Sequence, residues 1–347
     1  MPGLTSPPPI TPVEPVTEIL HGVPVTDPYR WLEDQDSPRT REWIRNQTCC
    51  ARAYLDGISG RGRIRQRIRE FLAVETCDSL QKAGNRYFFR KRLAEQEQPC
   101  VYMREGPSGK DELLIDPSAR GSGRYTAVKP LRASPSGRLL LYEIKEGGER
   151  TGTFEILDVD ARNVLPDVLP RGYLRGFAFA SDEKSFYYVH EPLNAKSHSR
   201  RAVDHHALGT EFSEDRETFC AGEGDQIRLT VIADKNRLGF LVHKMFEKTL
   251  TSFYLQRLDE ENPPACVLPD AEFRIGPAFV RDTILAITDR GAPNLRIVEL
   301  RLRENQDVEW SDMVPENESR IQQWAVVADR TLVSYIRQAE THVSVFD

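Results

Sequence analysis

The 347-residue sequence lacks any long unbroken apolar run. No window approaches the ~18 apolar residues that a membrane-spanning helix requires. The first residues, MPGLTSPPPITPVEP, have neither the charged start nor the apolar stretch of a secretory signal. We therefore expect a soluble, cytoplasmic protein without a membrane partner.

Paired cysteines and a surplus of basic residues are also missing. The six cysteines show no C-x-x-C spacing, which argues against a disulfide framework or a zinc site and favours reduced thiols. The formal net charge is −6, whereas nucleic-acid-binding proteins usually carry a clustered basic face. Five arginines stand at every second position from Arg61 to Arg69, and this spacing distributes them around a helix. We interpret them as solvated helix surface and expect no nucleic-acid partner.

The motifs of several enzyme classes are absent as well. The G-x-S-x-G turn of α/β-hydrolases does not occur, and the nearest strings, around Ser59 and Ser108, lack the final glycine. The seven histidines include no H-E-x-x-H, and neighbours such as His205 and His206 would point to opposite faces of a strand. No glycine-rich phosphate-binding loop is present. These absences predict no catalytic residue, no metal site and no cofactor.

Carboxylates are numerous, and a pair of Asp or Glu side chains can form a glycosidase site. Candidates for such a site are Glu149, Asp158, Asp160, Asp182 and Asp234. Roles in turns and on the surface explain these residues better than catalysis does.

Helical signals are confined to the start of the chain. Proline is frequent up to about residue 26, which favours an extended arm over a packed element. Ser37 and Pro38 form a good N-cap and first helical position, and Gly57 and Gly60 end the helix. A second amphipathic helix is predicted from an apolar face made of Ile64, Ile68, Phe71 and Leu72.

From about residue 77 the sequence consists of short strands that repeat. An apolar strand, a polar turn and a second apolar strand recur five times, with Pro135, Asp182, Asp234, Asp282 and Asp329 marking the turns. A third strand and a fourth strand ending in DVLP, CVLP or DMVP follow in several units. Four strands in about 48 residues are typical of a β-propeller blade.

The fold class expected from these patterns is mainly β: a β-propeller preceded by an arm and two α-helices. Residues 1–75 would form the arm and helices, and residues 76–347 would form six blades, the last of which stops at HVSVFD before its fourth strand. If about 400 Å² of apolar surface on one face of a blade stays exposed, the protein loses on the order of 10 kcal/mol of hydrophobic stabilisation. We therefore expect the isolated chain to be marginally stable.

The segment HGVPVTDPYRWLED, followed by SPRTREWIRNQ, resembles the N-terminal signature of the prolyl oligopeptidase family of serine peptidases. The strings LPDVLP, HHALGTEFSED, TDRGAPNLRIVEL and VPENESRIQQW resemble later family segments in the expected order, so the resemblance extends from His21 to Asp347. The DPY-x-WLED form is closer to prolyl oligopeptidases than to oligopeptidase B.

This resemblance implies a seven-bladed propeller that caps an α/β-hydrolase domain and admits short peptides. The apolar residues of the first segment would then dock on that domain: Tyr29, Trp31, Leu32, Trp43 and Tyr54. The hydrolase domain and the seventh blade are absent from these 347 residues, so no catalytic residue is carried over, and the chain alone is expected to be inactive.

The resemblance also implies three substrate contacts. Leu174, with Tyr173 beside it, matches a family aromatic that faces the substrate, and Glu149 matches an acidic residue that faces the hydrolase domain or a bound peptide. Core packing of Leu174 and a solvated turn at Glu149 are the alternative interpretation. A stand-alone propeller that binds a peptide or protein partner is the alternative function.

Overall fold

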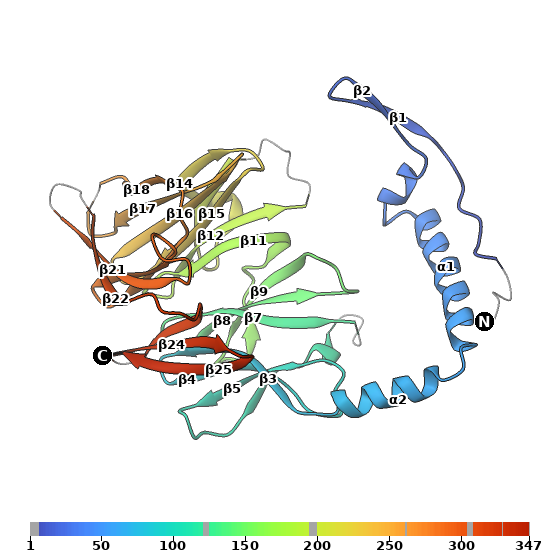
Figure 1. Cartoon of the computed structure of the whole chain (residues 1–347), viewed down its shortest axis with the longest axis horizontal. Helices are drawn as coiled ribbons and strands as arrows, with labels where there is room; N and C mark the ends of the chain where they lie inside the picture. The colour runs from blue at the N-terminus through green and yellow to red at the C-terminus, as the bar shows by residue number, and fades with distance from the viewer. Residues whose placement is uncertain are drawn as a thin grey trace. The chain divides into compact units, whose positions relative to one another are not determined.

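The computed structural model describes residues 7–120, 125–193, 200–260, 262–303, 308–327 and 329–346. The protein is mainly β, as expected, and divides into two compact units, residues 1–74 and 75–347. Each unit is described separately below, with the element labels of Figure 1.

The first unit begins with a hairpin that the sequence did not suggest. Strands β1 (Val16–Leu20) and β2 (Val23–Asp27) are antiparallel, and His21 and Gly22 connect them with positive φ angles of 52° and 83°. Two successive positive φ angles are typical of the tight turn that matches strand twist. The expected extended arm to residue 26 is therefore wrong for its second half, because the local turn geometry pairs the two strands.

The remainder of this unit is the short helix η1 (Arg30–Glu33) and two α-helices, α1 (Pro38–Asp56) and α2 (Arg61–Leu72). The predicted cap is confirmed: the Ser37 side chain accepts a hydrogen bond of 3.1 Å from the Thr40 amide. The proline-rich residues are not a free arm either. Trp43 donates to Thr11 Oγ1 (3.0 Å) and Gln47 donates to the Pro9 carbonyl (2.9 Å), which fasten this segment to α1.

Within the described residues the second unit is a β-propeller of six blades, as the repeats predict, and Figure 1 shows the blades following one another along the chain. In each blade the first strand along the chain is the innermost one, and the later strands follow outward. Blade 1 contains β3 (Thr76–Ala83), β4 (Arg86–Arg92), β5 (Cys100–Glu105) and β6 (Glu112–Ile115); blade 2 contains β7 (Ala127–Ala133), β8 (Leu139–Lys145), β9 (Gly152–Asp158), β10 (Asn163–Val164) and the start of β11 (Leu169–Phe179); blade 3 contains the rest of β11, β12 (Ser185–Pro192), β13 (Arg200–Ala207) and β14 (Arg216–Glu223).

The last three blades repeat the layout. Blade 4 contains β15 (Ile227–Ala233), β16 (Arg237–Met245), β17 (Thr249–Arg257) and β18 (Ala265–Ala271); blade 5 contains β19 (Ile275–Val280), β20 (Thr283–Thr288), β21 (Arg296–Leu302) and β22 (Val308–Val314); blade 6 contains β23 (Ile321–Val327), β24 (Arg330–Arg337) and β25 (Glu340–Phe346). Within the described residues the sixth sheet thus has three strands.

Five apolar clusters fill the spaces between successive blades. Strand β12 shows how one strand serves two of them. Phe186 and Tyr188 pack toward blade 2, whereas Tyr187 and Val189 pack toward blade 4. Because side chains alternate between the two faces of a strand, a strand buried on both faces reads as a continuous apolar run.

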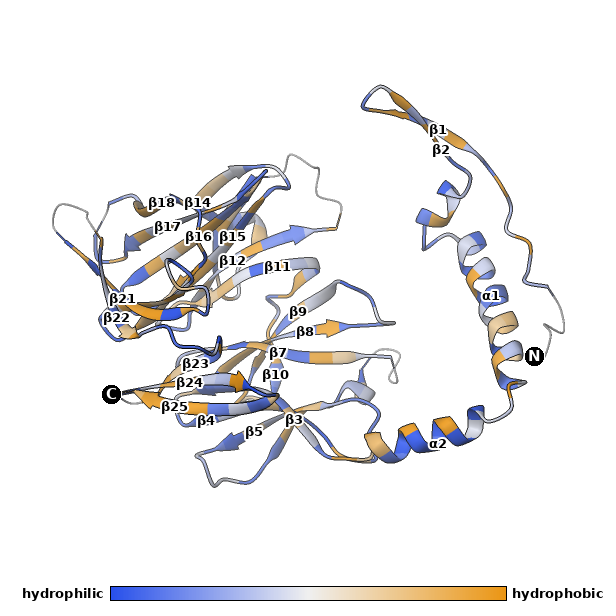
Figure 2. Cartoon of the chain, in the orientation of Figure 1, coloured by the Kyte–Doolittle hydropathy of each residue, from blue (hydrophilic) through white to orange (hydrophobic). Residues whose placement is uncertain are grey.

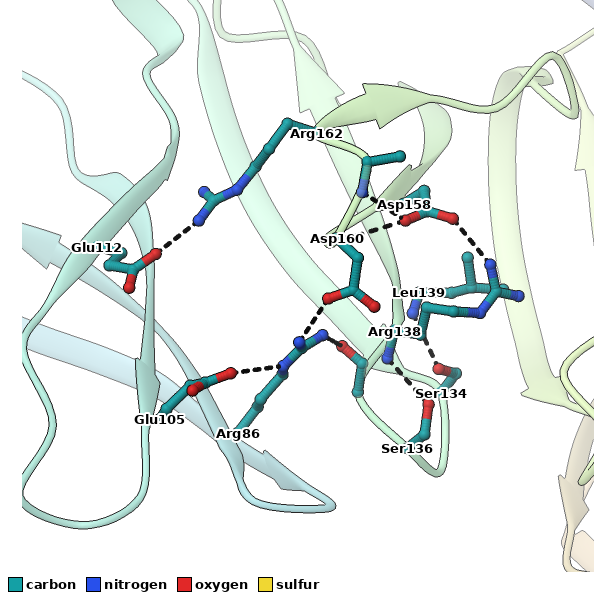
Figure 3. A network of polar contacts seen from close by, with 12 residues as sticks. Arg86, Glu105, Glu112, Ser134, Ser136, Arg138, Leu139, Asp158, Asp160 and Arg162 are labelled. Carbon is teal, nitrogen blue, oxygen red and sulfur yellow. Dashed lines mark hydrogen bonds and ion pairs between the residues drawn. The ribbon is translucent and has the colours of Figure 1, made fainter.

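The turns between the first and second strands of successive blades are also joined by polar contacts. Arg86 donates to the Gly137 carbonyl (3.1 Å) and pairs with Asp160, as Figure 3 shows. Arg237 in blade 4 likewise donates to the carbonyls of Arg281 (2.7 Å) and Asp282 (3.0 Å) in blade 5. These contacts fix the ends of the innermost strands relative to one another.

Candidate functional site: the channel and the blade 2–3 surface

A pocket of about 540 Å³ lies among the innermost strands of five blades. Residues at the C-terminal ends of β3, β7, β11, β15 and β19 line it, so it is one end of the central channel of the propeller. One alanine comes from each blade: Ala83, Ala133, Ala178, Ala233 and Ala278. These small side chains leave room in the bore for a ligand.

The charged groups in this lining are both basic. Lys82 and Arg132 are among the lining residues, and no carboxylate side chain is. The Lys82 ammonium donates to the Gly84 carbonyl at 2.9 Å. This end of the channel therefore presents positive charge among apolar walls.

A second pocket, of about 480 Å³, is lined by the end of β8, the loop that follows it, β9 and the start of β11. Glu149 lines this pocket and forms an ion pair with Arg171, the residue that also donates to Thr151 Oγ1 at 3.3 Å. Glu149 is thus held by a guanidinium, although its side chain remains partly exposed.

Tyr173 lies two residues beyond Arg171 on β11 and is 37% exposed. The Arg175 guanidinium sits 4.4 Å from the centre of its ring. Arg175 also donates to Glu191 Oε2 at 2.9 Å, so the cation over the ring is fixed by a carboxylate. The surface of β11 therefore offers a phenol ring of fixed orientation.

Leu174 points the other way. It is half-buried and packs against the apolar cluster between blades 2 and 3. The structure therefore pairs Glu149 with Arg171, two residues before the exposed Tyr173 on β11, whereas Leu174 packs into the core.

Two buried polar groups lie directly behind this surface. His190 Nε2 has no hydrogen-bond partner, and burial lowers the pKa of this histidine despite a hydrogen bond with the Pro170 carbonyl. Arg201 forms an ion pair with Glu191 Oε1 at 3.4 Å. The same oxygen accepts no hydrogen bond from the described residues. Both groups reflect a tightly packed region, since a Cβ on Gly172 would lie 2.5 Å from His190 Nε2.

A histidine–carboxylate cluster was missed by the sequence analysis. His206 is fully buried, and its ring nitrogens lie 2.7 Å from Asp215 Oδ1 and 3.0 Å from Asp167 Oδ1. Phe212 stacks on the ring at 4.1 Å and Tyr188 donates to Asp215 at 2.8 Å. Because the imidazole is sealed from solvent, this cluster joins blades 2 and 3 and offers no access to a substrate.

The other residues considered from sequence have structural roles. Asp158, Asp182 and Asp234 accept hydrogen bonds from backbone amides in the turns that follow them, and Asp160 pairs with Arg86. In the described residues no group of three or more potential ligands is arranged to hold a metal ion. All six cysteines are free.

The apolar residues of the first unit divide into two sets. Trp31 and Trp43 meet edge to face at 6.3 Å, and Arg39 covers Trp31 at 4.2 Å, so both rings serve the internal packing of this unit. Tyr29 and Tyr54 are exposed and Leu32 is half-buried. The apolar face of α2 is also exposed, and Figure 2 shows it as orange bands; it comprises Ile64, Ile68, Phe71 and Leu72. Among the described helices, none has the length and apolar character needed to cross a membrane.

Comparison with known proteins places these features in a family. Residues 8–347 match the model of the prolyl oligopeptidase N-terminal β-propeller domain. The chain is 26% identical over 306 residues to a prolyl endopeptidase of Elizabethkingia miricola, which covers 86% of this chain and 43% of that protein. A dual function macrocyclase-peptidase of Amanita bisporigera is 25% identical over 270 residues, 65% of this chain and 36% of that protein.

Solved structures show the same fold. A prolyl endopeptidase superposes with a TM-score of 0.77 at 24% identity, covering 97% of this chain and 51% of that one. Prolyl oligopeptidase B from Galerina marginata, bound to a 35-residue substrate, gives a TM-score of 0.74 at 16% identity over 97% of this chain and 51% of that one. The chain spans about half the length of these relatives. It belongs to the prolyl oligopeptidase family, of which it forms the N-terminal propeller portion.

Proposed function

We propose that this chain is the propeller and docking portion of a prolyl oligopeptidase-like serine endopeptidase that acts on short proline-containing peptides. The observation that carries the proposal is the family match over residues 8–347, combined with relatives about twice as long. In the whole protein, the hydrolase domain would supply the serine, histidine and aspartate, and the propeller would select peptides by size. The 347 residues alone would have no peptidase activity.

The exposed apolar residues of the first unit support docking on a hydrolase domain. Ile64 and Phe71 on α2 are 61% and 65% exposed, which is a large apolar area for a helix in contact with water. Tyr29, Trp31, Leu32, Trp43 and Tyr54 would contribute to the same docking surface. The two tryptophans would act mainly by holding the segment in shape, since they already pack within it.

The substrate-facing residues would be those at the start of β11. The Tyr173 ring is a flat surface on which a proline ring can pack, and Glu149, with Arg171, would contact the peptide or the hydrolase domain. Leu174 would act from the core, by supporting the strand that carries Tyr173. A cytoplasmic location is part of the proposal, in keeping with six free cysteines.

A proline-linked chromogenic peptide tests this function. We expect the purified chain not to cleave it. The reading frame beyond Asp347 provides the second test, because the proposal expects it to continue in frame to a G-x-S-x-G turn. A stop codon at that point followed by an unrelated gene would instead support a stand-alone propeller that binds peptides, the alternative that the channel pocket favours.

A further inference from the structure

The innermost strands carry far more positive charge than the chain as a whole. The sequence has 47 basic and 53 acidic residues. The innermost strands, β3, β7, the blade 3 part of β11, β15, β19 and β23, nevertheless contain only one acidic residue, Asp78, against five basic ones: Lys82, Lys129, Arg132, Arg175 and Arg228. The centre of the propeller is therefore cationic within an acidic protein.

Of the two basic residues that line the channel pocket, Lys82 donates to the Gly84 carbonyl (2.9 Å), whereas Arg132 has no partner among the described residues. Elsewhere on the innermost strands, Arg175 forms an ion pair with Glu191, and Arg228 donates to the carbonyls of Asp225 and Ile227. Lys129 likewise forms no hydrogen bond or ion pair with the described residues, but it does not line the pocket. No described residue forms a hydrogen bond or ion pair with Arg132, although it lines the channel pocket. Arg132 is exposed to solvent, yet the protein atoms around its guanidinium lower the pKa of the group by desolvation.

The backbone around Arg132 is held in a special conformation. The pairing of β7 with β8 shifts register between Pro130 and Arg132, which is a bulge that can redirect a side chain. The Gln81 side chain of blade 1 bridges this bulge, because its amide nitrogen donates to the Pro130 carbonyl (3.2 Å) and its oxygen accepts from the Ala133 amide (3.2 Å). Gln81 is thus a positioning residue for Arg132.

A guanidinium that lines a pocket without a carboxylate partner favours an anionic ligand. Arginine stays charged at neutral pH, and its planar fork fits a carboxylate with two parallel hydrogen bonds. The pocket of about 540 Å³ has the size of a small-ligand site, and its alanines and phenylalanines suit an extended peptide. Lys82 adds a second positive charge to the same lining.

We propose that Arg132, supported by Lys82, binds the carboxylate of a peptide in the channel, so that the propeller prefers acidic peptides. The carboxylate can be a C-terminus or an aspartate or glutamate side chain. The proposal deepens the proposed function, since it rests on the propeller admitting peptides, but the binding itself requires no hydrolase domain.

The test measures binding of three fluorescently labelled peptides to the 347-residue chain by anisotropy: Ala-Ala-Pro-Glu-amide, Ala-Ala-Pro-Ala with a free C-terminus, and Ala-Ala-Pro-Gln-amide. At least one carboxylate peptide is expected to bind about tenfold more tightly than the glutamine amide. The first two peptides distinguish a side-chain from a C-terminal carboxylate. The preference should shrink in about 0.5 M NaCl, because salt screens the charge.

Two variants locate the binding site. Arg132→Gln is expected to bind all three peptides equally, with unchanged affinity for the glutamine amide. Arg216→Gln removes the same charge from an exposed position on β14, where the arginine forms no ion pair with any described residue, and should keep the preference. Gln81→Leu should weaken the preference without changing the net charge.

The results of these binding measurements either support the carboxylate site or overturn it. Equal binding of the three peptides, no binding at all, or a preference that survives Arg132→Gln overturns it. If the glutamine amide binds and the acidic peptides bind no better, the peptide-binding role of the propeller stands while the carboxylate site fails. Cleavage assays on the whole peptidase are separate, so failure of the catalytic assignment leaves this measurement unaffected.

Discussion

Glu183 of blade 3 accepts two hydrogen bonds from Ser136 of blade 2, one from the backbone amide (2.6 Å) and one from the hydroxyl (2.7 Å). Glu183 is buried and has a φ angle of 55°, in the left-handed region. The two hydrogen bonds that the Glu183 carboxylate accepts from the turn of the neighbouring blade therefore offset the cost of this unfavourable backbone conformation. The same pattern of turn-to-turn contacts recurs between blades 1 and 2 and between blades 4 and 5.

Replacement of Glu183 separates the two effects. Glu183→Ala should lower the free energy of unfolding by about 2–3 kcal/mol, because the Ser136 amide loses a charged acceptor. Glu183→Gly loses the same bonds but relieves the backbone, so its cost should be smaller by about 1 kcal/mol. Urea denaturation of the three proteins measures both differences. Equal losses for alanine and glycine would contradict the assigned backbone strain.

The N-cap of α1 gives a second stability prediction. Ser37→Ala removes the acceptor of the Thr40 amide and should cost about 1 kcal/mol. Ser37→Asp should preserve the cap, because aspartate is an equally good N-cap residue. The helical signal of far-ultraviolet circular dichroism during thermal unfolding checks both variants. A loss that is the same for alanine and aspartate would argue against the cap.

Arg132 and Arg86 should respond in opposite ways to loss of charge. Arg132→Gln should leave stability unchanged or raise it slightly, because the guanidinium has no partner and is desolvated. Arg86→Gln should lower stability by about 1–2 kcal/mol, since Arg86 bonds to Gly137 and Asp160 of the next blade. Unfolding in guanidinium chloride measures the stability of both variants and of the unchanged protein. A marked loss for Arg132→Gln would indicate a structural role for that residue.

Partly buried histidines should make the propeller sensitive to mild acid. Burial lowers the pKa of His190, His205 and His243 in the folded protein. Below the unfolded value of about 6.5, the unfolded chain therefore binds protons that the folded chain does not, so stability is full above that pH and falls as the pH decreases. The urea midpoint is expected to be lower at about pH 5.5 than at about pH 8.

A histidine variant assigns part of this dependence. His190→Gln should flatten the decline between the two pH values, whereas the same change at the exposed His342 should leave it as it is. If the urea midpoint of both variants decreases with pH as much as that of the unchanged protein, His190 does not contribute to the pH dependence.

The outer face of blade 6 should make the isolated chain self-associate. Val343, Val345 and Ile336 lie on the face of the sheet opposite the blade 5 cluster and are 61%, 52% and 50% exposed. Val343→Lys with Val345→Lys should reduce association, because it breaks an exposed apolar patch. Light scattering at several protein concentrations measures it, with Val13→Lys, on an exposed residue of the first unit, as a matched control.

Local features of the fold could be predicted from the sequence. The strand–turn–strand repeats and the Ser37 cap depend on neighbouring residues, and the structure confirms both. The hairpin at His21 and Gly22 was missed because proline content outweighed a short strand signal. His206 meets Asp167, 39 residues away, and Gln81 meets Pro130, 49 residues away. Such distant contacts leave no local pattern, so neither the buried histidine nor the channel arginine stood out.

We propose above all that the catalytic residues of the peptidase lie outside these 347 residues, in a hydrolase domain that the propeller covers. The most direct measurement is hydrolysis of a proline-linked chromogenic peptide by the purified chain, with and without a serine-directed inhibitor. We expect no turnover in either sample. Turnover that the inhibitor abolishes would contradict it, because a nucleophile would then lie within these 347 residues.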